Sequence, residues 1–123
     1  MVLGSIFTSN KPRITSNGGG DYARVNVNEN TRFVTDVQTY DKYSTEANGR
    51  WKYSIIGGAS AKFFEIDSRT GKLFFKQAPE FENARDVIGQ DNLYEVKVQV
   101  RDGAGYTDSQ RLLVKVKDVQ ENS

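Results

Sequence analysis

The chain has 123 residues, which suits a single domain with its own hydrophobic core. Hydrophobic residues make up 37% of it, and no apolar run approaches the roughly 20 residues that a membrane helix needs. The 17 basic and 16 acidic residues give a net charge of +1. This balance implies no basic face and argues against nucleic acid as a partner. The absence of cysteine excludes disulfides and thiolate chemistry. The absence of histidine removes the commonest general base and the commonest zinc ligand. Any metal site must therefore use oxygen ligands, which suit calcium or magnesium.

Apolar and polar residues alternate with a period of two almost throughout the chain, and no stretch of ten residues has helical periodicity. In chain order, the alternation predicts seven strands, at 25–27, 33–39, 51–55, 64–66, 73–75, 94–100 and 112–116. One buried face on each strand predicts an all-β fold, a seven-stranded Greek-key β-sandwich of the immunoglobulin-like kind. The expected core residues are Trp51, Tyr53, Ile55, Phe64, Leu73, Phe75, Tyr94, Val96, Leu112 and Val114.

Turn signals separate these segments. The run 16–20 (SNGGG) predicts a flexible break within or before the first strand, and Asn48-Gly49 predicts a tight turn. In 67–71 (DSRTG), we expect Asp67 to cap local amides and Gly71 to adopt a left-handed conformation, so turn chemistry explains this aspartate without a ligand role. The run 102–105 (DGAG) predicts a hairpin between the last two long strands.

Five acidic residues follow strand ends that a Greek-key sandwich brings to one pole. Glu29 follows the first strand, Glu80 and Glu82 follow the fifth, and Asp118 and Glu121 follow the last. A single loop carboxylate is usually just solvated. Five together would repel one another unless a hard divalent cation, bound by about 6–8 oxygens, compensated the charge. The set therefore predicts a metal site at this pole, which we call the C-terminal pole.

Several segments, in this order and at these spacings, resemble a cadherin-like repeat of bacterial surface or secreted proteins. The resemblance covers roughly residues 10–122, which defines a domain over 10–119, with 1–9 as a lead-in and 120–123 as the start of a linker between repeats. The matching segments are VNVNEN (25–30), VQTYD (37–41), WKYSI (51–55), FFEIDSRTGKL (63–73), APEFEN (78–83), YEVKVQVRDGAG (94–105) and VKVKDVQEN (114–122).

The resemblance implies Ca²⁺ as the bound ion. It assigns calcium ligands at the C-terminal pole to Glu29, Glu80, Glu82, Asp118 and Glu121. It also directs Gln120 and Asn122 toward a calcium shared with the next repeat.

At the opposite pole, the resemblance implies that Asp41 and Asp102 accept calcium from the preceding repeat's linker. Tyr43 stands where the family has a further aspartate, and a phenol is a poor ligand for a hard cation. The lead-in residues 6–10 supply no acid in its place. We therefore expect this pole to hold no calcium at millimolar concentration.

Three tyrosines, Tyr40, Tyr43 and Tyr106, are expected in loops at that opposite pole. Loop tyrosines commonly pack against their own loops. Alternatively, the three form an aromatic patch suited to a partner protein or to stacking on a sugar ring.

Two functions follow from these expectations. The first is an extracellular adhesive or structural repeat, rigidified by calcium, whose partners are neighbouring repeats or another cell-surface protein. The second is a calcium-dependent carbohydrate-binding module whose partner is a polysaccharide. An enzyme is not expected, because Glu80 and Glu82 could imitate a catalytic carboxylate pair but no histidine or glycine-rich loop supports them.

Overall fold

The alternating segments form strands in the computed structural model, which describes residues 12–40, 51–84 and 91–119. Within these ranges the chain contains nine strands and three short 3-10 turns. In chain order they are β1 (Arg13–Ile14), η1 (Asn17–Gly19), β2 (Tyr22–Asn28), β3 (Phe33–Asp36), β4 (Thr39–Tyr40), β5 (Lys52–Gly57), η2 (Ala61–Phe63), β6 (Phe64–Ile66), β7 (Lys72–Phe75), η3 (Phe81–Asn83), β8 (Leu93–Arg101) and β9 (Thr107–Lys117). The predicted Asn48-Gly49 turn, the lead-in 1–9 and the linker 120–123 lie outside the described residues.

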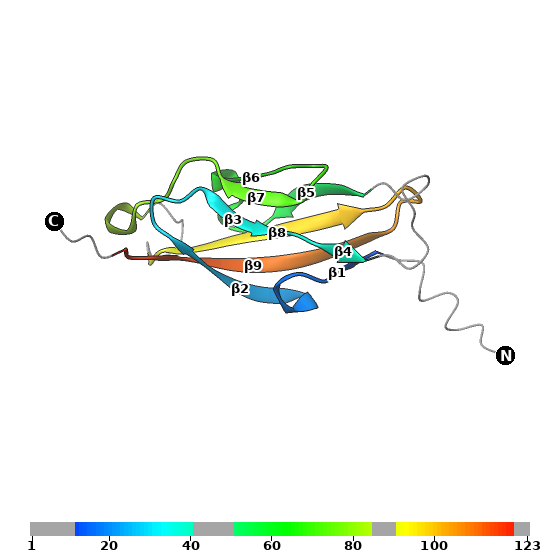
Figure 1. The fold of residues 1–123 in the computed structure, drawn as a ribbon, viewed down its shortest axis with the longest axis horizontal. Coiled ribbons are helices and arrows are strands. Elements are labelled where there is room, and N and C mark those ends of the chain that lie inside the picture. The colour runs from blue at the N-terminus through cyan, green and yellow to red at the C-terminus, as the bar shows by residue number, and fades with distance from the viewer. Residues whose placement is uncertain (1–11, 41–50, 85–90, 120–123) are drawn as a thin grey trace.

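Two sheets make up most of the fold, one with strand order β2-β9-β8-β5 and one with order β3-β7-β6. Figure 1 shows the three-stranded sheet lying over the long β8 and β9 strands. Neighbouring strands are antiparallel except β2 and β9, which run parallel in unbroken register from Tyr22–Arg111 to Asn28–Lys117. The predicted all-β sandwich is confirmed.

Eight of the nine described strands overlap the seven predicted segments, because the segment 33–39 forms both β3 and β4. The remaining strand, β1, was not predicted. The chain changes sheets at η1, because β1 pairs with β4 whereas β2 pairs with β9. The break predicted at 16–20 is therefore a defined turn, held by the buried Gln110 side chain, whose Nε2 donates to the carbonyls of Ser16 (3.1 Å) and Gly20 (2.8 Å).

The core lies between the two sheets and contains eight of the ten residues expected there as buried side chains. The other two, Trp51 and Ile55, are half-buried and pack against the core. An aromatic cluster fills its centre: the rings of Phe64 and Phe75 stack with centroids 4.6 Å apart, and Tyr94 meets Phe75 edge-on at 5.2 Å. The buried hydrophobic residues are Ile14, Val27, Val34, Val37, Tyr53, Phe64, Leu73, Phe75, Tyr94, Val96, Val98, Val100, Leu112, Val114 and Val116.

The simple alternation predicted over 33–39 was wrong. It placed Phe33 on the same face as Val37 and Val34 on the opposite face. In the structure, Phe33 is 44% exposed, whereas Val34 and Val37 are both buried. The pairing with β7 shifts register between Phe33 and Thr35, and β3 ends at Asp36, so the period of two is lost between the two valines.

The expectation that the chain has no basic face was also wrong. Along β8 and β9, every second residue points away from the core, and cross-strand partners share a face. The outer face of the β2-β9-β8-β5 sheet carries Arg111 and six further cations. Glu95 lies among them, and Asp91 lies beside Glu95. The six are Arg24, Lys52, Lys97, Arg101, Lys115 and Lys117. The net charge is a sum over the whole chain and does not show how charges are distributed. The alternation of side chains along each strand places these cations together on one face of the sheet.

Candidate metal centre

The parallel pairing of β2 and β9 brings two acids from opposite ends of the chain together. The last paired residues are Asn28 and Lys117, so Glu29 and Asp118 leave the sheet side by side. The amide of Glu29 donates to the carbonyl of Lys117 at 2.9 Å, which extends the ladder by one bond. An antiparallel pair would have placed these two strand ends at opposite poles.

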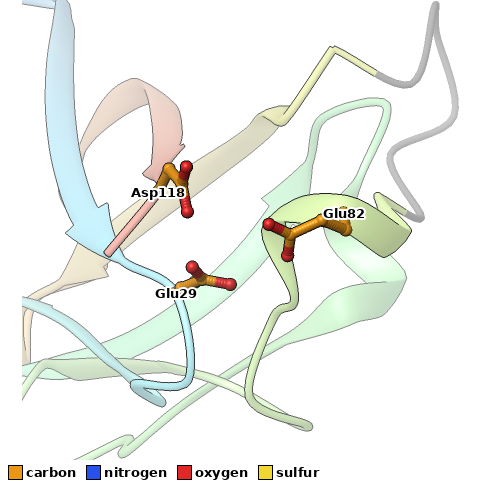
Figure 2. A group of neighbouring side chains, drawn as sticks. All are labelled: Glu29, Glu82 and Asp118. Carbon is orange, nitrogen blue, oxygen red and sulfur yellow. The ribbon is translucent and has the colours of Figure 1, made fainter. Parts of the chain in front are cut away.

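Glu82 completes a group of three carboxylates. It lies in η3, and Figure 2 shows its carboxylate directed toward those of Glu29 and Asp118. One oxygen from each residue lies within 4.8 Å of the other two. Oxygens that bind one calcium ion lie about 2.3–2.6 Å from it and hence at most about 5 Å from one another. The three carboxylates are therefore spaced to share a calcium ion.

Glu29 is the buried member of the group, and Glu82 and Asp118 are exposed. Its Oε2 accepts a hydrogen bond from the amide of Val119 (2.9 Å), and its Oε1 accepts one from the amide of Phe81 (3.1 Å). These two bonds hold the pKa of the Glu29 carboxyl below its ordinary value, outweighing the opposing effect of burial. These hydrogen bonds therefore favour an ionised Glu29 and hold its side chain in position without a bound metal ion.

The position of Glu82 depends on two asparagines that the sequence interpretation did not single out. Asn30 donates its amide to the carbonyl of Pro79 (2.7 Å), and the Asn92 side-chain Nδ2 donates to the carbonyl of Phe81 (3.1 Å). Both asparagines have a left-handed backbone, with φ of 65° and 66°. Asparagine tolerates this conformation better than most residues, and that preference was the available sequence signal.

Glu80 lies outside the group of three carboxylates. Its Oε1 accepts a hydrogen bond from Asn83 Nδ2 at 3.2 Å, within its own turn. The other expected ligands at this pole, Glu121, Gln120 and Asn122, lie outside the described residues.

At the opposite pole, Asp102 is buried and closes the β8–β9 turn. Its Oδ1 accepts hydrogen bonds from the amides of Ala104 (3.0 Å) and Tyr106 (2.9 Å), and its own amide donates to the Tyr106 carbonyl (2.9 Å). This geometry is turn chemistry, as at Asp67, whose Oδ1 accepts the amides of Arg69 and Thr70. Asp41 and Tyr43 lie outside the described residues.

Two of the three tyrosines can be placed. Tyr106 lies in the β8–β9 loop as expected and is 45% exposed, whereas Tyr40 ends strand β4 instead of lying in a loop and is 57% exposed. Among the described aromatic residues, no ring contact joins Tyr40 to Tyr106. The structure therefore leaves both rings accessible without joining them in one aromatic cluster.

The family model of the cadherin domain matches residues 23–117, and the chain belongs to the cadherin domain family. Human protocadherin gamma-A1 is 31% identical over 103 residues, covering 80% of this chain and 10% of the relative. Chimpanzee protocadherin gamma-A10 is 28% identical over 104 residues, covering 81% and 10% respectively. The chain thus spans about a tenth of the length of these relatives.

Solved structures agree with this assignment. Mouse clustered PcdhgC3 EC1-3 superposes with a TM-score of 0.66 at 26% identity, covering 89% of this chain and 34% of that one. The solution structure of the third cadherin domain from human protocadherin 7 superposes with a TM-score of 0.67 at 20% identity. This match covers 93% of this chain and 92% of that one. The second match includes nearly the whole of a single domain, so the likeness extends over the complete fold.

Membership of this family confirms two expectations, that the domain is extracellular and that it belongs to a class of adhesion domains. Cadherin domains in general bind Ca²⁺ and are not enzymes. Among the described residues, no helix is long and apolar enough to cross a membrane.

Proposed function

We propose that this domain is a calcium-binding adhesive or structural repeat whose ion is held at the C-terminal pole. The observation that supports this most directly is the approach of the Glu29, Glu82 and Asp118 oxygens to within 4.8 Å of one another. With neither cysteine nor histidine in the chain, the donors are hard oxygens, the ligands that calcium prefers.

The hydrogen bonds already made by Glu29 are compatible with metal binding. Each carboxylate oxygen has two lone pairs. One lone pair can accept the hydrogen bond from the amide of Val119 or Phe81, while the second lone pair of the same oxygen faces the ion. Three carboxylates provide fewer than the 6–8 ligands that calcium takes. We assign the remaining positions to water, Glu80 and Glu121, and we direct Gln120 and Asn122 toward a calcium shared with the next repeat.

The role proposed for the ion is to stiffen the junction with a neighbouring repeat. Glu29, Glu82 and Asp118 come from three separate segments that meet at the exit of β9. A shared ion would fix the direction in which the chain leaves the domain. Neighbouring repeats and another cell-surface protein are the partners we propose, and an origin in bacterial surface proteins stays a prediction.

Calcium titration by calorimetry tests this assignment. Lacking a second repeat's ligands, the chain should bind with a dissociation constant of roughly 10⁻⁴–10⁻³ M, the class of extracellular modules. Glu82→Gln keeps the side-chain shape, removes one charge and should weaken binding severalfold. Glu65→Gln is the control, because Glu65 lies on the surface of β6 in an exposed pair with Arg32. Equal titrations for Glu82→Gln and the parent would refute the site.

The carbohydrate-binding alternative depended on the three tyrosines acting together with calcium. Tyr40 and Tyr106 are exposed, but they share no ring contact, and Asp102 is engaged by its own turn. Nothing in this arrangement favours a calcium-dependent sugar site over the adhesive role. Contact of a partner or glycan with Tyr40, Tyr43 and Tyr106 stays a prediction.

A further inference from the structure

Cations stand directly beside one another at two places on the outer face of the four-stranded sheet. Lys52 pairs with Arg101 across β5 and β8, and Lys97 pairs with Arg111 across β8 and β9. Directly opposite residues of an antiparallel pair have Cβ atoms about 4.5–5.5 Å apart, and like charges in such positions repel. These pairs therefore oppose the stability of the sheet.

Acidic residues neutralise little of this charge. The Glu95 carboxylate binds Arg111 at 2.8 Å, and the same side chain accepts the amide of Ala59. Over the described ranges, no ion pair joins an acid to any of the six other cations on this face. Five of those six are exposed, and Lys97 is half-buried.

The cations form a long strip and not a compact patch. They follow β8 and β9 from Arg101, opposite Thr107, to Lys117 at the far end of β9. At about 3.3 Å per residue, this length of strand measures roughly 30 Å. Arg24 on β2 and Lys52 on β5 widen the strip across all four strands. A ligand that matches it must be extended and carry repeated negative charges.

We propose that this strip binds a linear sulfated polysaccharide. The domain is extracellular, where such polyanions surround cells, and a flexible chain can follow the twist of a sheet. The exposed guanidinium groups of Arg24 and Arg101 suit planar, two-point contact with sulfate oxygens. A DNA duplex is a stiff rod, with a persistence length of about 50 nm, so it would touch fewer points of a twisted face. The strip ends at Lys117, next to Asp118, but binding to it requires no calcium at the proposed metal centre.

Binding of the 123-residue chain to immobilised heparin tests the strip. The chain should be retained at about 0.1 M NaCl and released near 1 M, because the screening length falls from about 10 Å to 3 Å. Lys97→Gln/Lys115→Gln should weaken binding roughly tenfold, since each cation near a polyanionic surface contributes on the order of fivefold or less. Arg69→Gln/Lys76→Gln removes the same charge from exposed sites off this face and should bind like the parent.

Further measurements exclude the competing explanations. Retention should persist in EDTA, and desulfated heparin, duplex DNA and anionic phosphatidylserine vesicles should bind at least about tenfold more weakly. Lys52→Gln, on a different strand, should weaken heparin binding about threefold, so the result does not depend on one variant folding. Equal losses in the two double variants, loss of retention in EDTA, or comparable affinity for DNA or vesicles would each overturn the proposal.

Discussion

The Glu29 carboxylate accepts a hydrogen bond from the amide of Val119, 90 residues further along the chain, at 2.9 Å. Its second oxygen accepts the amide of Phe81, 52 residues away, at 3.1 Å. One ionised side chain thus joins the ends of β2 and β9 to the loop that precedes β8. The same carboxylate belongs to the proposed calcium site, so we expect folding, protonation and calcium binding to be coupled at Glu29.

We predict that Glu29 makes stability depend on acid. Its pKa is lowered in the folded state, whereas an unfolded glutamate titrates near pH 4.3. The contribution is therefore fully present above about pH 4.3 and is lost as the pH falls through the lower, folded pKa. In EDTA, Glu29→Gln should melt below the parent at pH 6, and the difference should shrink by pH 3. A difference in melting temperature between Glu29→Gln and the parent that stays constant from pH 6 to pH 3 would contradict the prediction.

The fold should survive without calcium. The buried cluster around Phe64, Phe75 and Tyr94 supplies apolar burial that involves no metal. Far-UV circular dichroism in EDTA should therefore show a folded β protein. At about ten times the dissociation constant, calcium should stabilise it by roughly 1.4 kcal/mol and raise the melting temperature by about 5 °C. A chain that is unfolded in EDTA would instead make the ion a folding element.

Two glycines with similar backbone angles should respond differently to alanine. Gly71 has φ of 82°, and a Cβ there would lie 2.5 Å from the carbonyl oxygen of Val37. Gly18 has φ of 83°, with no atom within 4 Å of an added Cβ. Gly18→Ala should cost only the left-handed strain, about 1–2 kcal/mol, and Gly71→Ala should cost at least about 1 kcal/mol more. Denaturant unfolding measures both, and equal losses would show that the contact with Val37 relaxes freely.

Calcium should leave the opposite pole unchanged. Asp102 uses Oδ1 to hold the amides of Ala104 and Tyr106, and its pole lacks a carboxylate at Tyr43. In an NMR titration, we expect shifts at the amides around Glu29, Glu82 and Asp118, and little change at Asp41 and Asp102. Strong calcium-dependent shifts at Asp41 and Asp102 would show that a second ion binds there.

Local sequence signals predicted much of the fold. The alternation in β8 and β9 identified which residues would be buried, because side chains on a strand point to opposite faces in turn. The DSRTG turn was predicted down to the left-handed Gly71, since its constraints lie within five residues. Where a bulge interrupted the pattern, at Phe33 and Val34, the same reasoning failed.

The sequence by itself thus determined the strands, their buried faces and the acids placed after strand ends. Only the tertiary structure decided which of those acids meet, because the meeting of Glu29 with Asp118 requires β2 to lie parallel to β9. It likewise placed Lys97 opposite Arg111 and set Gln110 against the η1 turn. Pairing between strands is set by contacts between residues distant in sequence, and neither net charge nor local periodicity contains that information.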